Sequence, residues 1–408
     1  MTNVPVSTIS LDEYAHIVGE KKIEEIRLLA ENLKGKSVCH VNSTAFGGGV
    51  AEILSRLVPL MSNVGLKAEW KVMTGTNEFF NVTKTIHNGL QGMSVPFDDQ
   101  MRKTYLEYNE KNAQDLDLHH DFVFIHDNQP AAVIINYKIR TGKWIWRCHV
   151  DLSRPNSDVM QFLTPIIYQY DSLIFSLDKY VQEPLRSRKI AIIPPSIDPL
   201  SEKNRALPQD QILSVLNKYG INPEKPILTQ VSRFDPWKDP LGVIDVYRLV
   251  KQEIPSVQLL LVTSMANDDP EGWTYYEKTA RYAGNDYDIH LLTNFYGVGD
   301  IEVNAFQRAS SVVLQKSIRE GFGLSVTEAL WKEVPVVGGN AGGIPTQVID
   351  GQNGFVINTV QEAADKTLYL LGNPTEAKRM GKEGKKHVLN NFLITRDLED
   401  HLKLLSSL

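Results

Sequence analysis

The sequence predicts an α/β protein made of two doubly wound domains, and three observations support this fold class. The chain has 408 residues, which is too many for a single hydrophobic core. Apolar strand-like runs alternate with helical periods in both halves, a pattern typical of parallel sheets with both faces covered. The alternation breaks between residues 194 and 211, in a polar stretch with several prolines that we interpret as the linker.

The first half begins, after a helical stretch, with a buried strand, a glycine loop and an amphipathic helix. Further strands follow, and two of them end in polar residues. The predicted elements, in order, are strand 36–42, helix 50–64, strand 121–127, helix 131–139 and strands 143–151, 172–177 and 189–195.

The second half repeats this pattern and ends in charged helices. Its predicted elements are strand 225–235, helix 242–254, strand 257–264, helix 273–284, strands 288–295, 311–317 and 334–339, and a final amphipathic helix from residue 394. We therefore predict Rossmann-like domains over 1–195 and 196–385, facing each other across a cleft. Residues 386–408 are expected to form a helix that returns to the first domain.

Composition restricts the class of protein. A hydrophobic content of 42% and a charged content of 23% are ordinary for a globular protein, and the net charge of −6 argues against nucleic-acid binding. No apolar run reaches membrane-spanning length, and the first residues lack the pattern of a signal peptide, so we expect a cytoplasmic protein. Cys39 and Cys148 lie in apolar runs and are expected to be buried free thiols.

Two loops after strands carry groups suited to a diphosphate. Gly48 and Gly49 permit a tight turn before a helix whose N-terminus offers N–H groups to an anion. Arg233 and Lys238 lie in "SRFDPWKD", where a forked guanidinium and an ammonium suit phosphate oxygens. The alternatives are a turn chosen for backbone geometry and a solvated basic loop.

The stretch 317–339 places two carboxylates around a helix start expected near Gly323. Glu320 precedes the helix and Glu328 lies within it. A carboxylate suits a vicinal diol such as that of ribose, and the helix N-terminus suits a phosphate. The alternative is that the glutamates cap and solvate the helix start.

Two His–Asp neighbourhoods end strands of the first half. His126 precedes Asp127, and His149 lies two residues before Asp151. A lone histidine is more often structural than catalytic, but two such pairs at strand ends point to a site. Their spacing matches no zinc signature, so we predict no metal site.

Together these residues resemble the retaining nucleotide-sugar glycosyltransferases of the two-Rossmann (GT-B) fold. The two glutamates of "EGFGLSVTE", the Arg–Lys pair of "SRFDPWK" and the glycine loop are that group's hallmarks. The stretches "HVNSTAFGGGVAEIL", "WRCHVDLSRPN" and "SIREGFGLSVTEALWK" narrow the resemblance to trehalose synthases, from about residue 12 to the C-terminus. Trehalose phosphorylases share much of this pattern.

The resemblance implies a role for each site residue. Arg233 and Lys238 would hold the donor diphosphate, and Glu320 would contact the donor glucose. Glu328 would bind the ribose, and His149 would lie beside the glucose 6-hydroxyl. Backbone groups complete the expected set, at Gly48, Gly49, Leu324 and Ser325 for the diphosphate and at Gly297 for the base.

The reaction implied is transfer of glucose from UDP-, ADP- or GDP-glucose to glucose, reversibly and with retention, giving trehalose. Asp127 and Asp151 are candidates for a covalent nucleophile on position alone. The family view is instead front-face substitution, in which Arg233 and Lys238 stabilise charge on the leaving phosphate.

Three alternatives remain open: a trehalose phosphorylase, a transferase with another acceptor, and a non-catalytic nucleotide-sugar sensor. We expect no required cofactor, with Mg²⁺ acting at most as a stimulator. We also expect no membrane partner and a homodimer.

Overall fold

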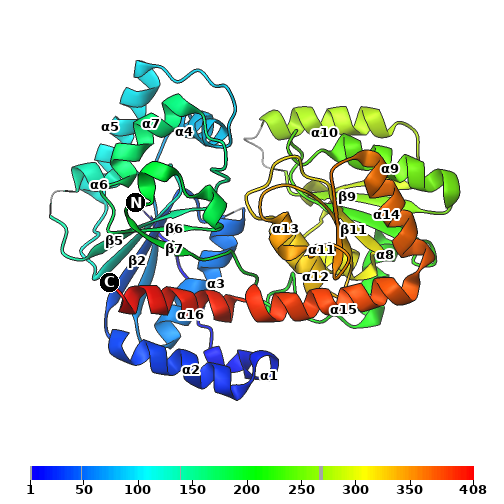
Figure 1. The fold of residues 1–408 in the computed structure, drawn as a ribbon, viewed down its shortest axis with the longest axis horizontal. Coiled ribbons are helices and arrows are strands. Elements are labelled where there is room, and N and C mark those ends of the chain that lie inside the picture. Colours follow the sequence, from blue (N-terminus) through cyan, green and yellow to red (C-terminus); the bar gives the residue numbers. More distant parts are fainter. Residues whose placement is uncertain (1, 47, 138, 266–269) are drawn as a thin grey trace. The chain divides into compact units, whose positions relative to one another are not determined.

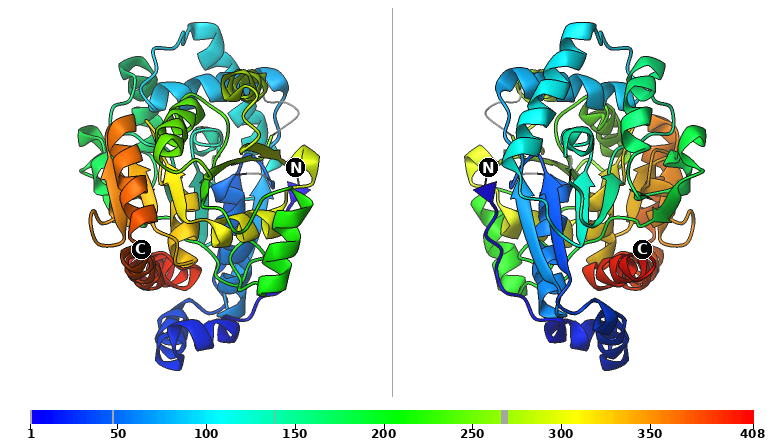
Figure 2. Two further views of the ribbon diagram at one scale, coloured as in Figure 1. Left: turned by 90° about the vertical axis from the view of Figure 1, so that its right-hand side faces the viewer. Right: turned by 90° about the vertical axis from the view of Figure 1, so that its left-hand side faces the viewer.

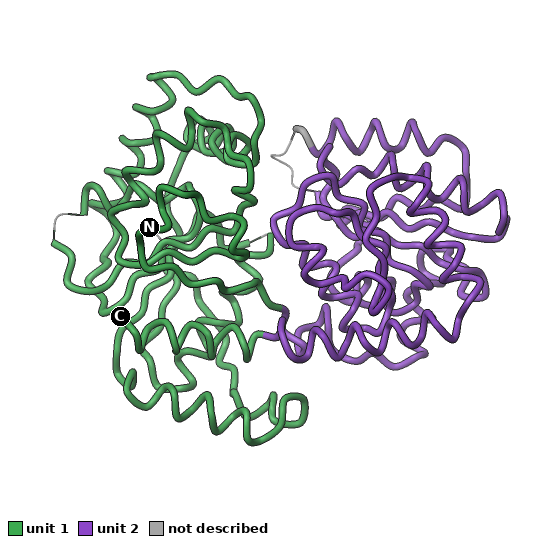
Figure 3. The backbone as a smooth tube through the Cα atoms, in the orientation of Figure 1, with its two compact units in different colours: residues 1–196, 394–408 green, residues 197–393 purple. Residues whose placement is uncertain are grey.

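Each half of the chain forms its own sheet of mainly parallel strands, and a computed structural model divides the chain into two units (Figure 3). The first unit comprises Met1–Ser196 and Ile394–Leu408, and the second comprises Ile197–Leu393. The structure describes residues 2–46, 48–137, 139–265 and 270–408. The chain returns to the first unit at Ile394, not at residue 386 as expected, because helix α15 (Pro374–Asn391) runs unbroken through that position.

The first unit contains a seven-stranded sheet. Strand β1 pairs antiparallel with β3, and all other neighbours are parallel. The strands lie in the order β1 (Thr2–Asn3), β3 (Lys67–Val72), β2 (Ser37–Asn42), β4 (Phe122–His126), β5 (Lys143–Cys148), β6 (Ser172–Phe175) and β7 (Lys189–Ile192).

Alternation along these strands directs side chains to two different faces of the sheet. Cys39, Val41 and Val123 belong to a core that the helices α4–α7 cover. His40 and Phe124 have the opposite parity and stack with 4.5 Å between ring centroids. The helices of this unit are α1 (Ala15–Val18), α2 (Glu20–Ala30), α3 (Gly49–Asn63), α4 (Asn77–Leu90), α5 (Asp99–Asp115), α6 (Val133–Asn136), α7 (Ser157–Ile167) and α16 (Ile394–Ser406).

The C-terminal helix α16 lies against α2 and α3, as predicted for a helix that returns to the first unit (Figures 1 and 2). Two details of the prediction were wrong or incomplete. The helix expected over 131–139 is the single turn α6, and the prediction did not include β3, α4, α5 and α7. Strand β3 carries lysine and glutamate at alternate positions, so it lacks the apolar run of its neighbours.

The second unit contains a six-stranded, wholly parallel sheet. Its strands lie in the order β10 (Ile289–Thr293), β9 (Gln258–Thr263), β8 (Ile227–Val231), β11 (Val312–Gln315), β12 (Val336–Gly339) and β13 (Gly354–Ile357). The helices, besides α15, are α8 (Gln209–Lys218), α9 (Pro240–Glu253), α10 (Pro270–Ala283), α11 (Asp300–Ala309), α12 (Leu324–Trp331), α13 (Ile344–Gln347) and α14 (Val360–Gly372).

Both faces of this second sheet are buried, as its continuous apolar strands predict. Leu259 and Leu261 of β9 pack into a core with α9 and α14, whereas Leu260 and Val262 pack into another with α8 and α11. The two-Rossmann prediction is therefore confirmed for each unit.

The strand order reverses once in each sheet, and these reversals determine where loops diverge. In the first sheet β2 lies between β3 and β4, and in the second β8 lies between β9 and β11. Loops that leave neighbouring strands in opposite directions open a crevice at the carboxyl ends, where ligands of such sheets bind. The predicted site residues lie after β2, β4 and β5 in one unit and after β8, β10 and β11 in the other.

Candidate active site

The loops after β8 and β11 are joined directly at the strand reversal of the second unit. The backbone N–H of Ile318 donates to the carbonyl oxygen of Trp237 at 2.7 Å. The guanidinium carbon of Arg319 lies 5.3 Å from the centroid of the Trp237 ring, within cation–π range. These contacts hold the predicted basic loop beside the predicted glutamate loop.

Lys238 and Glu320, one from each loop, form the central ion pair of this region. Lys238 Nζ lies 2.7 Å from Glu320 Oε2, and their side chains are only 14% and 9% exposed. Ser317 Oγ also donates to Glu320 Oε2 at 3.2 Å, and Gln230 Nε2 donates to the Lys238 carbonyl oxygen at 2.7 Å. Charge and hydrogen bonds thus fix both groups before any ligand binds.

Arg233 stands at the open side of the same loop. Its side chain is 65% exposed, and its NH2 group lies 3.3 Å from Asp235 Oδ2. The other oxygen of Asp235 accepts from the backbone N–H groups of Trp237 at 2.9 Å and Lys238 at 3.0 Å. Asp235, which the sequence analysis missed, therefore shapes the loop that carries both cations.

Helix α12 begins where it was predicted, immediately after the glutamate loop. Gly323 is its N-cap at φ 88°, and no side chain caps the helix. A Cβ at Gly323 would lie 3.2 Å from Glu320 Cγ, so glycine is required both for the backbone angle and for space. Leu324 and Ser325 form the first turn, and Ser325 Oγ donates to Gln315 Oε1 at 3.1 Å.

Glu328 does not join the Lys238–Glu320 pair but lies in a separate buried network. Its Oε1 is 3.0 Å from Lys203 Nζ and its Oε2 accepts from Gln307 Nε2 at 3.4 Å, with the carboxylate 1% exposed. Burial alone would raise the pKa of Glu328, but the positive charges of Lys203 and Lys332 and these hydrogen bonds outweigh it and hold the pKa below its ordinary value. Glu328 is therefore an ionised, paired carboxylate.

The predicted glycines occupy two different kinds of turn. Gly48 has φ 80° and is the N-cap of α3, whose first residue is Gly49, whereas Gly47 lies outside the described residues. Gly297 has φ 78° and ends the short 3₁₀ helix η5 (Asn294–Tyr296). Its carbonyl oxygen accepts from the hydroxyl of Tyr219 at 2.9 Å.

In the first unit, the carboxyl ends of β4 and β5 place Asp127 against the backbone of His149. Asp127 Oδ1 accepts from the His149 N–H at 2.7 Å, and His149 Nε2 lies 3.0 Å from Nδ1 of His126. Asp151 does not join them. Its Oδ1 accepts from the backbone N–H of Ser153 at 2.8 Å, which closes a local turn.

Asp127 has two unusual properties. It adopts φ 61°, a left-handed conformation that is rare outside glycine and is tolerated best by Asn and Asp. Burial raises the pKa of its carboxyl to about 7, although the hydrogen bond from His149 and the charge of Arg147 lower it in part. A strained backbone and a perturbed carboxyl are both more frequent at functional sites than elsewhere in proteins.

Comparison with known proteins agrees with this geometry. Residues 40–182 match the family model described as trehalose synthase, N-terminal domain, and residues 214–387 match glycosyl transferases group 1. A trehalose synthase of Thermococcus litoralis is 57% identical over 97% of each chain. A trehalose synthase of Rubrobacter xylanophilus is 50% identical over 98% of this chain and 97% of its own.

The chain belongs to the trehalose synthase family. Family membership makes it a glycosyltransferase. A trehalose phosphorylase of Pleurotus pulmonarius is more distant, at 28% identity over 85% of this chain and 54% of its own length. The fold is also that of a trehalose-phosphate synthase from Burkholderia xenovorans, with a TM-score of 0.72 at 11% identity over 91% of this chain and 100% of that one.

Several residues around the candidate site were missed by the sequence analysis. They are the partners that hold the predicted groups, namely Lys203, Asp235, Gln307, Gln315 and Ser317. Gln315, which ends strand β11, and Ser317, two residues further on, could have been noticed because both closely precede Glu320 in the chain. Lys203 lies in the stretch that was interpreted as linker, so no local pattern connects it to Glu328.

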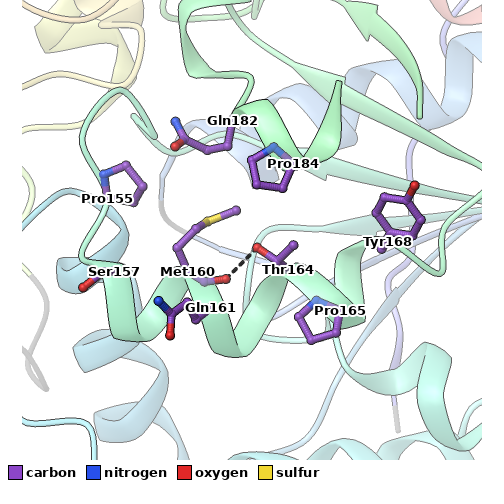
Figure 4. Close-up of a pocket in the computed structure, with 9 residues that line it drawn as sticks. All are labelled: Pro155, Ser157, Met160, Gln161, Thr164, Pro165, Tyr168, Gln182 and Pro184. Carbon is purple, nitrogen blue, oxygen red and sulfur yellow. Dashed lines mark hydrogen bonds between the residues drawn. The ribbon is translucent and has the colours of Figure 1, made fainter. Parts of the chain in front are cut away.

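Two other features of this family member lie apart from the predicted residues. A cavity of about 670 Å³ runs along α7, lined mainly by apolar groups such as Met160 and Pro184 (Figure 4).

Cys39, Glu69 and His120 bring potential metal-ligand atoms within 4.8 Å of one another, but Lys71 Nζ lies 2.7 Å from the Glu69 carboxylate and competes with a cation. No helix among the described residues could cross a bilayer.

Proposed function

We propose that this enzyme transfers glucose from a nucleoside-diphosphate glucose to free glucose, with retention and reversibly, to form trehalose. The Lys238–Glu320 contact carries the proposal, because it sets a phosphate-binding cation beside a carboxylate suited to sugar hydroxyls at a strand reversal. The nearly full-length similarity to trehalose synthases supports trehalose as the product.

Arg233 and Lys238 would stabilise charge on the leaving diphosphate. Lys238 has three N–H donors, of which Glu320 takes one, so the remaining two can reach phosphate oxygens. The exposed guanidinium of Arg233 can close over the same group. The backbone amides at Gly48, Gly49, Leu324 and Ser325 would add uncharged donors, as helix N-termini do.

Glu320 would contact the donor glucose, and Glu328 would bind the ribose by way of its remaining lone pairs, with Lys203 keeping it ionised. Gly297 would offer backbone to the base. His149 would face the glucose 6-hydroxyl.

We further propose that Asp127 is a positioning residue and that glucose transfer proceeds by front-face substitution. The position of this carboxyl supports that role, because its Oδ1 already accepts a hydrogen bond from the His149 N–H at 2.7 Å. Asp127 fixes the backbone of His149, whose carbonyl would lie near the reacting carbon. The Asp151 carboxylate instead closes a local turn by accepting a hydrogen bond from the backbone N–H of Ser153.

The deciding experiment offers UDP-, ADP- and GDP-glucose separately with glucose and identifies any disaccharide by chromatography and NMR. Formation of α,α-trehalose is expected with at least one donor, and EDTA should not abolish it. Nucleotide-sugar binding without any product would indicate a sensor. Transfer of glucose to another sugar, with none to glucose itself, would show that the proposed acceptor is wrong.

A trehalose phosphorylase is the second candidate, favoured by the similarity to the Pleurotus enzyme. It predicts glucose 1-phosphate from trehalose and phosphate, with no need for a nucleotide. The same preparation should be assayed in that direction. If the protein forms glucose 1-phosphate and transfers no glucose from a nucleotide donor, it is a phosphorylase and our proposal is wrong. The cytoplasmic location and the homodimer stay predictions.

A further inference from the structure

Three histidines of the first unit, His149, His126 and His40, form a chain of ring-to-ring contacts. His149 Nε2 lies 3.0 Å from His126 Nδ1, and His126 Nε2 lies 3.0 Å from His40 Nδ1. His40 and His126 occupy the sheet face opposite the α4–α7 core, on the neighbouring strands β2 and β4. The sequence separates them widely, and the proposed mechanism uses only His149.

Such a chain couples the tautomers of its members. A neutral imidazole has one N–H donor and one acceptor nitrogen, so each N···N contact needs a donor on one side only. Both hydrogen bonds can form only if they point in the same direction along the chain, either inward from His149 to His40 or outward from His40 to His149. Either His149 donates inward and leaves Nε2–H of His40 at the far end, or His40 donates outward and leaves Nδ1–H of His149 at the site.

The surroundings of His40 Nε2 favour the outward sense. This atom is buried and has no hydrogen-bond partner among the described residues. A buried N–H without an acceptor is rarer, and more costly, than an unused acceptor. The charged and titratable groups that act on His40 are His401, Arg147 and Asp397. Burial, followed by the charges of His401 and Arg147, lowers the pKa of His40, and Asp397 raises it in part, so the ring stays neutral.

The three rings are neutral in this environment. Burial is the main cause that lowers the pKa of His40, His126 and His149 well below the ordinary value. His149 is partly exposed, and its hydrogen bonds to other described residues are made by its backbone N–H and its Nε2 rather than by its Nδ1. That atom is therefore available to a ligand.

We propose that His40 and His126 are positioning residues that hold His149 in its Nδ1–H tautomer, so that the site presents an N–H donor. Within the proposed function, on which this last step rests, the donor would bind a hydroxyl oxygen of the transferred sugar. The tautomer itself is a property of the ligand-free protein.

The test reads tautomers directly from long-range ¹H–¹⁵N correlation spectra of the full chain labelled with ¹⁵N-histidine. A His149→Gln variant identifies the His149 signal by its loss. We expect His149 in the Nδ1–H form without substrate. A wild-type His149 in the Nε2–H form would overturn the proposal, whatever the variants do.

Two variants of nearly equal size separate hydrogen bonding from packing. Asn at position 126 can donate from the place of Nδ1, whereas Leu cannot. His126→Asn should keep His149 in the Nδ1–H form, and His126→Leu should give a mixture of tautomers. His126→Leu should also lower kcat/KM for the donor about tenfold more than His126→Asn does. A pure Nδ1–H signal in His126→Leu would contradict our inference.

Failure of the proposed function would look different. An Nδ1–H signal together with no glucosyl transfer would leave the tautomer inference standing and reject the reaction. Trehalose formation together with an Nε2–H signal would support the reaction and overturn the inference.

Discussion

At the scale of single residues, the site charges are already paired in the absence of ligand. Lys238 is paired with Glu320, and Glu328 with Lys203, whereas Arg233 extends from its loop at 65% exposure. A substitution at a paired group therefore changes stability as well as chemistry. Arg233 is paired with Asp235 at an exposed position, so a substitution there should change the free energy of unfolding little.

Arg233→Ala and Lys238→Ala should both lower kcat by about 10²-fold, the usual cost of losing one donor to developing charge. Only Lys238→Ala should also reduce the free energy of unfolding, by about 1–3 kcal/mol, because it leaves the buried Glu320 carboxylate without its charge partner. Steady-state kinetics and urea unfolding measure the two effects. Unchanged kcat in either variant would reject the diphosphate assignment.

Asp127 should make stability depend on pH in a direction unusual for a carboxylate. Its folded-state pKa of about 7 lies above the ordinary 3.8, so the folded state binds the proton more tightly. The stabilisation that Asp127 adds to the free energy of unfolding is therefore fully present below pH 3.8. This stabilisation, of a few kcal/mol, is lost as the pH rises to 7.

Asp127→Asn is the matched variant, because Asn tolerates φ 61° and still accepts the His149 N–H. Its free energy of unfolding relative to wild type should rise between pH 4 and pH 7. A difference that does not vary with pH would show that Asp127 titrates normally.

At the scale of elements, two helices depend on contacts made at a few positions. Helix α12 begins at a glycine that adjoins Glu320, and α16 is held by a buried charge network. Arg147 NH1 lies 2.8 Å from His401 Nε2 and 3.6 Å from Asp397 Oδ1, and Ser196 Oγ donates to Asp397 Oδ2 at 2.7 Å.

Gly323→Ala should cost about 1–2 kcal/mol for the left-handed backbone and should also lower kcat, because the added Cβ displaces Glu320. Gly351→Ala is the control. It has φ 73° but no atom within 4 Å of the added Cβ, so it should cost a similar free energy and leave kcat unchanged. Equal kcat in both variants would indicate that Glu320 tolerates the displacement.

Asp397→Leu should destabilise the first unit by about 3–5 kcal/mol, because it leaves the guanidinium of Arg147 buried without a counter-charge. The double variant Arg147→Met/Asp397→Leu should recover most of this loss. Urea unfolding of the wild type, both single variants and the double variant completes the cycle. Additive losses would show that the two groups do not stabilise each other.

At the scale of the whole molecule, the first unit is discontinuous in sequence, whereas the second is one segment. Residues 394–408 supply α16, whose Leu398 and Leu402 are fully buried. The first unit thus depends on the end of the chain, and the second does not.

A chain truncated after Leu393 should therefore lose hydrogen-exchange protection in β4 and β5 while the strands of the second sheet stay protected. A segment of residues 197–393 produced alone should fold cooperatively. Hydrogen exchange with mass spectrometry measures the protection of the strands in the truncated chain. Circular dichroism during urea unfolding tests whether the isolated segment folds cooperatively. Unchanged protection of β4 and β5 would show that the first unit does not need α16 for its stability.

The sequence by itself determined the strands, the fold class and the loops that carry polar groups. Apolar periodicity depends on near neighbours in the chain, so strands such as β8 and β11 and the start of α12 at Gly323 could be predicted. Polar residues at strand ends also led us to predict Arg233, Lys238, Glu320 and His149 as site residues, because a parallel sheet of this kind brings such residues to its carboxyl edge.

Only the tertiary structure decided which of these groups meet. Lys238 pairs with Glu320 across 82 residues, and His40 with His126 across 86. Arg147 bonds His401 across 254 residues. No local pattern encodes such pairs, because they follow from strand order and from the return of α16. The same reason explains why Glu328, seemingly the companion of Glu320, lies instead in a separate buried network with Lys203.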